Sequence, residues 1–186
     1  MTEILLSLCV GLALSASSGF RVFVPMLVAN LGTKFGILHL TSGFDWMGSD
    51  TATIVFATAT VVEIAAYYVP VLDNFLDTLA APASLVAGTI LTTSFLPIDS
   101  PVLKYGLGIL AGGGMAGTIQ AGTGLLRLAS TKFTAGFGNS FLSTAENAIS
   151  ITGSLLTLWI PVIMASIAIL LFVFLVKKLI NRFSKT

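Results

Sequence analysis

Charged residues are scarce in this chain. Lys, Arg, Asp and Glu together make up 9% of its 186 residues, whereas they make up about 25% of a typical soluble domain. Hydrophobic residues account for 55% of the chain, and the mean hydropathy is +0.99. So few charges cannot cover a water-facing surface of this size. The composition therefore excludes an ordinary soluble protein and predicts a single integral membrane domain, residues 1–186.

Cysteine and histidine are nearly absent as well. The single Cys9 rules out an internal disulfide framework and a cysteine-rich metal site, and the single His39 cannot form a histidine cluster. The net charge of +1 provides no basic field for nucleic acid. The run Gly112-Gly113-Gly114 lacks the Gly-Lys-Ser/Thr that completes a phosphate loop. We therefore expect no enzyme activity, no metal, no cofactor and no nucleic-acid partner.

Long hydrophobic runs fill most of the sequence. A helix that spans the hydrocarbon core of a bilayer needs about 20 mostly apolar residues. Five stretches reach or approach this length: 4–31, 51–69, 79–96, 102–128 and 149–176. The first, fourth and fifth are long enough to be either single tilted spans or pairs of half-helices, and Pro161 could kink the fifth. The predicted fold class is an all-α polytopic membrane protein with about five spans.

The C-terminal tail is basic and sets the expected orientation. Its four basic residues are Lys177, Lys178, Arg182 and Lys185. Because loops on the cytoplasmic side of a membrane are rich in Lys and Arg, we expect the C-terminus in the cytoplasm of a bacterium and the protein in its inner (plasma) membrane. Five spans then place Arg127 and Lys132 outside, against the rule. This exception would vanish if one long stretch were a re-entrant pair.

Two stretches of the sequence resemble each other. They are 11–35 and 109–133, and one constant offset aligns Gly19 with Gly117 and the Thr-Lys-Phe that ends each stretch. Three spans would separate the copies, so the copies would have opposite orientation, as in the inverted repeats of secondary transporters. The predicted pseudo-repeat divides the chain into halves 1–98 and 99–186.

Each copy is interrupted by small residues, at Ser15–Gly19 and at Gly112–Gly117. Unwound segments there could bind an ion or a small anion through free backbone groups and half-helix ends. Alternatively, the small residues let neighbouring helices pack closely. We predict that the two interruptions lie close together near the bilayer centre. The candidate pathway residues in them are Ser17, Ser18, Gly19, Gly113 and Gly117.

Arg21 and Glu63 lie inside the first two apolar stretches. A charge at that depth is costly and usually faces a cavity or a partner. Counted from the ends of their stretches, both residues lie roughly 15–18 Å from the same membrane face, so the two can form an ion pair near mid-membrane. The pair is either a gate linked to a substrate or a buried salt bridge that only fixes helix registry.

Further acidic residues have two interpretations each. Asp73 and Asp77 lie one turn apart, so their carboxylates could bind a cation, or they could form a solvated helix start. Ser143 and Glu146 have the spacing of a capping box before an apolar run, which would give Glu146 a structural role.

One family resemblance covers most of the chain. The residues that carry it are, in order, Ser18, Gly19, Phe20, Arg21, Phe23, Pro25, Glu63, Pro70, Asp73, Leu76, Asp77, Lys132, Thr134, Gly136, Asn139, Ser143 and Glu146. With them the chain resembles an uncharacterised bacterial membrane-protein family, domain of unknown function 4126. The family often has Ala-Asp-Lys where this chain has Ala66-Tyr67-Tyr68, so any role of that Asp-Lys pair is absent here. The resemblance implies a membrane protein and supplies no activity.

The function predicted first is a small membrane transporter or channel for an ion or small solute. Its pathway would lie at the interface of the two interrupted helices, with Arg21 and Glu63 as pathway or gate residues. We expect a homo-oligomer in the lipid bilayer, because five spans enclose little space. The alternative is a non-transporting membrane scaffold or lipid-handling protein. A third hypothesis is a membrane enzyme that acts on lipid head groups through Asp73 and Asp77.

Overall fold

The structure, a computed structural model, describes residues 2–134 and 137–183, and within them the chain forms helices joined by short irregular segments. The α-helices are α1 (Thr2–Ser18), α2 (Phe23–Lys34), α3 (Asp50–Ala66), α4 (Pro70–Phe95), α5 (Pro101–Leu107), α6 (Gly114–Thr134), α7 (Phe137–Thr157) and α8 (Pro161–Phe183). A 3₁₀ helix, η1 (Asp45–Gly48), precedes α3, and a π-helical segment, η2 (Gly108–Gly113), joins α5 to α6. The predicted all-α class is confirmed for these residues.

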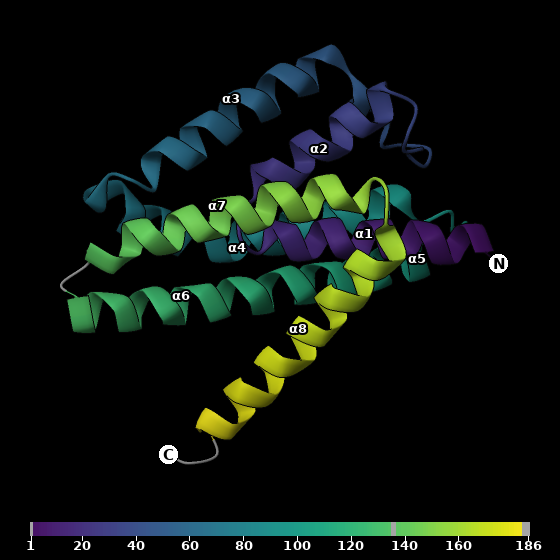
Figure 1. The fold of residues 1–186 in the computed structure, drawn as a ribbon. Helices are drawn as coiled ribbons and strands as arrows, with labels where there is room; N and C mark the ends of the chain where they lie inside the picture. The colour runs from purple at the N-terminus through teal and green to yellow at the C-terminus, as the bar shows by residue number, and fades with distance from the viewer. Residues whose placement is uncertain (1, 135–136, 184–186) are drawn as a thin grey trace.

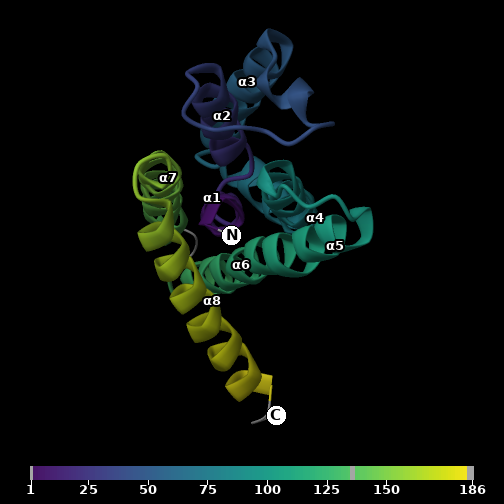
Figure 2. The same cartoon turned by 90° about the vertical axis from the view of Figure 1, so that its right-hand side faces the viewer.

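Helix α1 lies at the centre of the bundle. It contacts α4, α6, α7 and α8, and the end-on view shows these helices around it (Figure 2). Helices α2 and α3 form a second layer on one side, and α8 leaves the bundle obliquely on the other (Figure 1). From Val10 to its end at Ser18, every residue of α1 is buried. The first apolar stretch thus supplies the core rather than a lipid-facing span.

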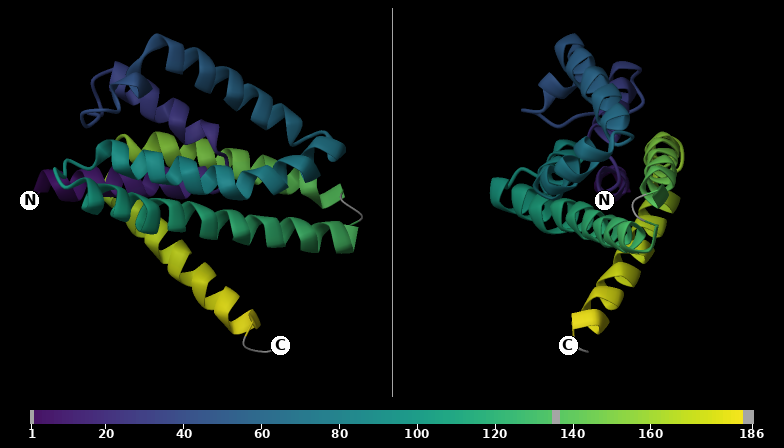
Figure 3. Two further views of the ribbon diagram at one scale, coloured as in Figure 1. Left: turned by 180° about the vertical axis from the view of Figure 1, so that it is seen from behind. Right: turned by 90° about the vertical axis from the view of Figure 1, so that its left-hand side faces the viewer.

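The first stretch turns back on itself. Helix α1 ends at Ser18, the chain is non-helical from Gly19 to Val22, and α2 then runs back toward the side from which α1 came (Figures 1 and 3). A Cβ on Gly19 would lie 2.6 Å from the Ala116 carbonyl oxygen, so only glycine allows this close approach. The stretch 4–31 is therefore a pair of helices, which is one of the two forms that the sequence left open for it.

The last stretch is also two helices. Helix α7 starts at Phe137 and ends at Thr157, and α8 starts at Pro161 and runs back past it (Figure 1). A proline has no N–H to donate and favours the first turn of a helix. Pro161 therefore begins a new helix, and the stretch 149–176 has the second of the two forms that the sequence left open, a pair of helices.

The second interruption leaves its helix continuous. Helices α5 and α6 run on through η2 as one apolar helix, Pro101–Thr134, and the Gly112 end of the predicted interruption lies in the π-helical segment. Such π-helical segments are single-turn irregularities inside α-helices. Here the irregularity coincides with a close contact, because a Cβ on Gly88 of α4 would lie 2.6 Å from the Gly112 carbonyl oxygen.

The two interruptions do lie close together, as predicted. Gly19 faces Ala116 and Ile119 of α6. The Ser15 hydroxyl donates to the Gly88 carbonyl oxygen at 2.7 Å, and Gly88 in turn packs on Gly112. A side-chain hydrogen bond thus connects α1 to α4, and a close backbone contact connects α4 to η2. Both interrupted segments run in the same direction along the bundle (Figures 1 and 3).

Three helices are long and apolar enough to cross a membrane, by length and composition. They are Phe75–Phe95 within α4, Pro101–Thr134, and Pro161–Lys178 within α8. The α8 window is the most apolar of the three, and only 11% of it is buried within the protein. Since its outward side chains include Ile163, Leu170 and Phe174, which are all more than half exposed, this helix has the character of a lipid-facing span.

Helices α2 and α3 are held together by polar contacts at one end. The Asn30 side chain accepts from the Thr53 hydroxyl at 2.8 Å, and Lys34 forms an ion pair with Asp50. The hydrogen bond and charge of Lys34 lower the pKa of the exposed Asp50 carboxyl. The side chains of α3 that point away from α2 are apolar and exposed, such as Ile54 and Val61.

The glycine contact between α4 and η2 predicts a position-specific effect. Gly88→Leu should lower stability by about 1–3 kcal/mol or more, because overpacking forces the helices apart. Gly106→Leu is the matched control, since nothing lies within 4 Å of a Cβ at that position of α5. Thermal unfolding of the purified variants in detergent measures the difference. Equal losses for both variants would show that the contact does not constrain the bundle.

Candidate functional site

The buried face of α7 is polar along its whole length. Its buried residues are Asn139, Ser143, Glu146, Asn147, Ser150, Gly153, Ser154 and Thr157. Its exposed face carries Phe137, Phe141, Ile149 and Leu155. This polarity is the reverse of that of a helix on a water-soluble protein. Polar side chains therefore face α1 and α6, and most of the side chains that face outward, where a bilayer would lie, are apolar.

Arg21 lies in the break between α1 and α2 and is 1% exposed. Its Nη1 donates to Glu146 Oε2 at 2.9 Å and to the Phe20 carbonyl oxygen at 2.9 Å. Its Nε donates to Asn147 Oδ1, and its Nη2 donates to the Ser143 carbonyl oxygen at 3.2 Å. Because the chain is non-helical here, the guanidinium points directly into α7. All three of its nitrogens are satisfied by protein atoms.

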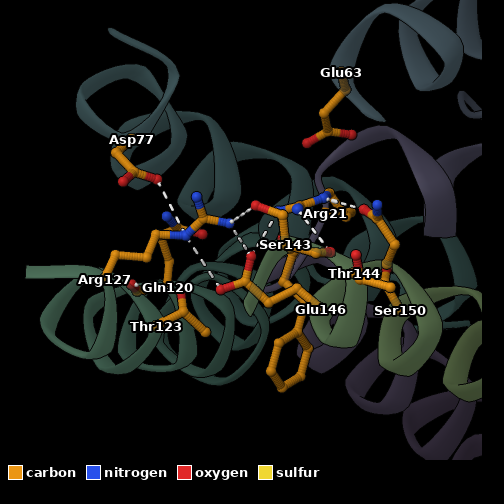
Figure 4. Close-up of polar contacts among 12 residues, drawn as sticks. Arg21, Glu63, Asp77, Gln120, Thr123, Arg127, Ser143, Thr144, Glu146 and Ser150 are labelled. Carbon is orange, nitrogen blue, oxygen red and sulfur yellow. Dashed lines mark hydrogen bonds and ion pairs between the residues drawn. The ribbon is translucent and has the colours of Figure 1, made fainter. Parts of the chain in front are cut away.

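Arg127 reaches the same carboxylate from α6 and is 2% exposed. Its Nη2 forms an ion pair with Glu146 Oε2, and its Nε donates to Glu146 Oε1 at 3.3 Å. The same Nη2 donates to the Ser143 hydroxyl at 3.0 Å, and Nε lies 3.6 Å from Asp77 Oδ1 of α4. Figure 4 shows the dashed lines from both arginines converging on Glu146. One carboxylate thus joins the break, α6 and α7.

An aromatic ring contacts both guanidinium groups. The Tyr67 ring centroid lies 3.8 Å from Arg21 Cζ and 4.5 Å from Arg127 Cζ. Cation–π attraction is strongest where water is excluded, and Tyr67 is 4% exposed. Its neighbour Tyr68 accepts from Asn147 Nδ2 at 3.3 Å through its hydroxyl. The pair Tyr67-Tyr68, which replaces the Asp-Lys common in the resembled family, thus belongs to the cluster.

Glu63 occupies a different place from the one we expected. Its carboxylate accepts the backbone N–H of Val22 at 2.7 Å and that of Phe23 at 3.0 Å. These amides open α2, so the carboxylate satisfies orphan donors and lies at the positive end of the helix dipole. Among the described residues the carboxylate partner of Arg21 is Glu146, and the predicted Arg21–Glu63 ion pair is not formed. Figure 4 shows Glu63 apart from the cluster.

Only one member of the predicted carboxylate pair, Asp73 and Asp77, has a side chain within the described residues. Asp77, whose side chain is 24% exposed, lies beside Arg127, and the side chain of Asp73 is outside the described residues. Both belong to α4, which already starts at Pro70. Within the described residues no group of three or more His, Cys, Asp or Glu side chains could hold a metal ion.

The remaining candidates make packing contacts around the cluster. The Ser18 hydroxyl donates to the Ser15 carbonyl oxygen at 2.8 Å, and the Ser17 carbonyl oxygen accepts from the Ser150 hydroxyl at 3.1 Å. Gly113 and Gly117 face Thr89 and Leu85 of α4. Ser17 therefore borders the polar face of α7, and Gly19 packs on α6. Gly113 and Gly117 pack on α4.

The cluster contains residues that sequence reasoning missed. Ser143 and Glu146 were interpreted as a capping box, but α7 starts at Phe137, so both lie within the helix and bind the arginines. A usable signal was present. Polar residues recur every three to four positions, which is the period of one helix face, at Asn139, Ser143, Glu146, Ser150, Ser154 and Thr157. Arg127 was treated only as an orientation signal.

One cavity lies away from the cluster. It has a volume of about 690 Å³ and lies between the start of α1, the segment 37–42 and the segment 95–99. His39 and Lys104 line it, and Lys104 Nζ donates to the Thr41 hydroxyl at 2.6 Å. None of the residues around Glu146 lines it.

Comparison with known proteins identifies a family. The family model described as "Domain of unknown function (DUF4126)" matches residues 8–180, so the chain belongs to this family, as the resemblance predicted. No curated protein and no solved structure matches the chain.

The shared carboxylate predicts an asymmetric response to mutation. Glu146→Leu should destabilise the protein by roughly 3–5 kcal/mol, because it leaves two buried guanidinium groups without their carboxylate. Adding Arg21→Leu should recover part of the loss, since one stranded charge is then removed. Denaturation of the single and double variants measures this coupling energy. A coupling of Arg21 to Glu63 as large as that to Glu146 would contradict the assignment.

Proposed function

We propose that this member of the DUF4126 family is a small membrane transporter or channel for an ion or small solute. Its pathway would follow the polar face of α7, past Arg21, Glu146 and Arg127. The observation that carries the proposal is that every buried residue of α7 is polar or glycine. From Asn139 to Thr157 this face is about 27 Å long at 1.5 Å per residue, close to the ~30 Å of a bilayer core.

Unused hydrogen-bonding capacity on this face supports the proposal. The Ser154 hydroxyl is fully buried and has no hydrogen-bond partner among the described residues. A buried hydroxyl without a partner costs stability, so its presence favours a role with a passing solute. Ser150 and Thr157 use their hydroxyls on backbone carbonyls, which leaves their oxygen lone pairs available as acceptors.

The charged cluster would act as the gate of this pathway. Glu146 closes the space between α1, α6 and α7 by binding Arg21 and Arg127 at once. An ion that passes must compete for one of these charges, and ionisable groups at membrane depth commonly mark such points. Glu63 would take part indirectly, because it holds the first turn of α2 and with it the position of Arg21.

The proposed topology has five crossings and one re-entrant pair. Helices α3, α4, α5 with α6, α7 and α8 would each cross once, and α1 with α2 would enter and leave on the same side. With the C-terminus in the cytoplasm of a bacterial inner membrane, Lys132 joins the basic tail inside, as the positive-inside rule favours. Lys34 and Lys104 are then outside.

A homo-oligomer is part of the proposal, whereas the inverted pseudo-repeat is not. An inverted repeat needs two copies that run in opposite directions, whereas α1 and α5 run in the same direction (Figure 1). The transport proposal does not depend on an inverted repeat.

A homo-oligomer is favoured because the exposed apolar surface of α8 could pack against a second copy.

A second candidate is a membrane scaffold or lipid-handling protein. The observation in its favour is the tight packing at both interruptions, where Gly19 meets Ala116 and Gly88 meets Gly112 without space for a side chain. In that case the arginine cluster fixes helix registry, and the glycines serve packing alone.

Flux through proteoliposomes tests the transport proposal. The purified protein should speed the efflux of at least one of potassium, sodium, chloride or glycerol over protein-free liposomes. Ser154→Leu should abolish that flux, because the larger apolar side chain fills the polar face of α7. Ser154→Ala should retain it, since the alanine leaves the space open.

Ser166→Leu is the matched control, because Ser166 is exposed on α8. Loss of flux in this variant as well would place the pathway elsewhere. Absence of flux for all four probes would overturn the transport proposal and put the scaffold candidate first.

Orientation can be measured separately. A reporter fused after Thr186 should be active only in its cytoplasmic form, because the basic tail follows α8. In a Cys9→Ser background, Asp99→Cys should react with a membrane-impermeant maleimide added to intact cells, since Asp99 is exposed in the turn between α4 and α5. Labelling only after the cells are opened would contradict the proposed crossings.

A further inference from the structure

A groove between α2, α3 and α4 has only apolar walls. Its volume is about 490 Å³, and the residues that line it are Val22, Phe23, Met26, Phe56, Leu79, Pro82, Ala83, Val86, Ala87 and Ile90. We propose that this groove binds one acyl chain of a bilayer phospholipid. The proposal is independent of the transport function.

The depth of the groove identifies its surroundings. The lining residues Leu79 to Ile90 lie inside Phe75–Phe95, the part of α4 that is long and apolar enough to cross a membrane. At that depth the surrounding solvent is hydrocarbon, because the bilayer core holds no water. A groove of 490 Å³ is many times the ~30 Å³ of a water molecule, and apolar cavities stay dry. Hydrocarbon is therefore the chemistry that fits it.

The groove is open toward the bilayer and closed toward the protein. On its rim, Leu79 is 48% and Val86 is 59% exposed, whereas Phe56 and Ala87 on its floor are 4% and 2% exposed. A lipid tail can enter sideways and would then contact three helices instead of the one face that a bulk lipid touches. Each methylene group of the tail then makes more van der Waals contacts than in bulk lipid, so the protein retains this lipid.

The fold holds the groove open from both sides. Helix α3 packs along α2 and meets α4 only slightly, and it diverges from the bundle (Figure 1). Glu63 anchors α3 to the first turn of α2 through Val22 and Phe23, which themselves line the groove. Pro82 lies in the interior of α4 on the groove wall, where the missing N–H and the ring bend a helix.

A second copy of this chain is a poorer occupant. A helix is about 10 Å across with its side chains, so three turns of helix would need on the order of 1,300 Å³. The groove offers 490 Å³. An extended hydrocarbon chain is much thinner than a helix and fits the available space.

Photolabelling tests the proposal directly. The full chain is reconstituted in phosphatidylcholine vesicles that contain a phosphatidylcholine with a diazirine on its acyl chain. After irradiation, groove residues such as Met26, Phe56 and Ala83 should carry more label than the exposed face of α7 around Ile149. Ala83→Trp should remove this preferred labelling, because the indole fills the groove. The control Ala148→Trp, exposed on α7, should leave it unchanged.

A count of retained lipids gives a second readout. After detergent extraction, native mass spectrometry should find one phospholipid fewer on Ala83→Trp than on the wild type and on Ala148→Trp. If Ala83→Trp does not fold, Ala83→Leu and Val86→Phe narrow the same groove. Label spread evenly over all exposed apolar helix faces, unchanged by these variants, would mean bulk lipid contact only and would overturn the proposal. Crosslinks from groove residues to a second protomer would overturn it in favour of self-association.

Discussion

The structure depends on one carboxylate, that of Glu146. Two guanidinium groups from distant parts of the chain bind it: Arg21 from the break after α1 and Arg127 from α6. All three side chains are at least nine-tenths buried. A buried charge without its partner costs several kcal/mol, so α1, α6 and α7 can pack only in the register that brings these groups together.

This constraint explains why the first helix is broken. If the helix continued through Gly19–Val22, Arg21 could not turn toward α7. The backbone amides of these residues would then donate to carbonyl oxygens of the same helix. The break creates two free amides at Val22 and Phe23, and Glu63 of α3 satisfies both. Two acidic residues therefore stabilise the same four-residue break in different ways. Glu146 neutralises the charge of Arg21, and Glu63 accepts hydrogen bonds from the free backbone amides.

Several features could be predicted from the sequence because they depend on local composition. The all-α class follows from long apolar runs, and the interruption at Gly19 from a row of small residues. The ion partner of Arg21 could not be predicted in this way. Its expected depth in the membrane matched that of Glu63, and this comparison took no account of α7. Ser143 and Glu146 satisfied a local capping pattern, yet α7 extends six residues before Ser143 to Phe137. A local motif was outweighed by a contact more than 120 residues away.

By itself, the sequence determined that this chain forms apolar helices, where small residues interrupt them, and which family it belongs to. These properties depend on hydropathy, glycine and proline positions, and residue order. Only the tertiary structure decided which charges pair, that two of the long stretches turn back, and that an apolar groove separates α3 from α4. Charge pairing and packing depend on which helices become neighbours in the folded protein. The observed arrangement of helices is the one in which unpaired buried charges and unfilled cavities together cost the least free energy.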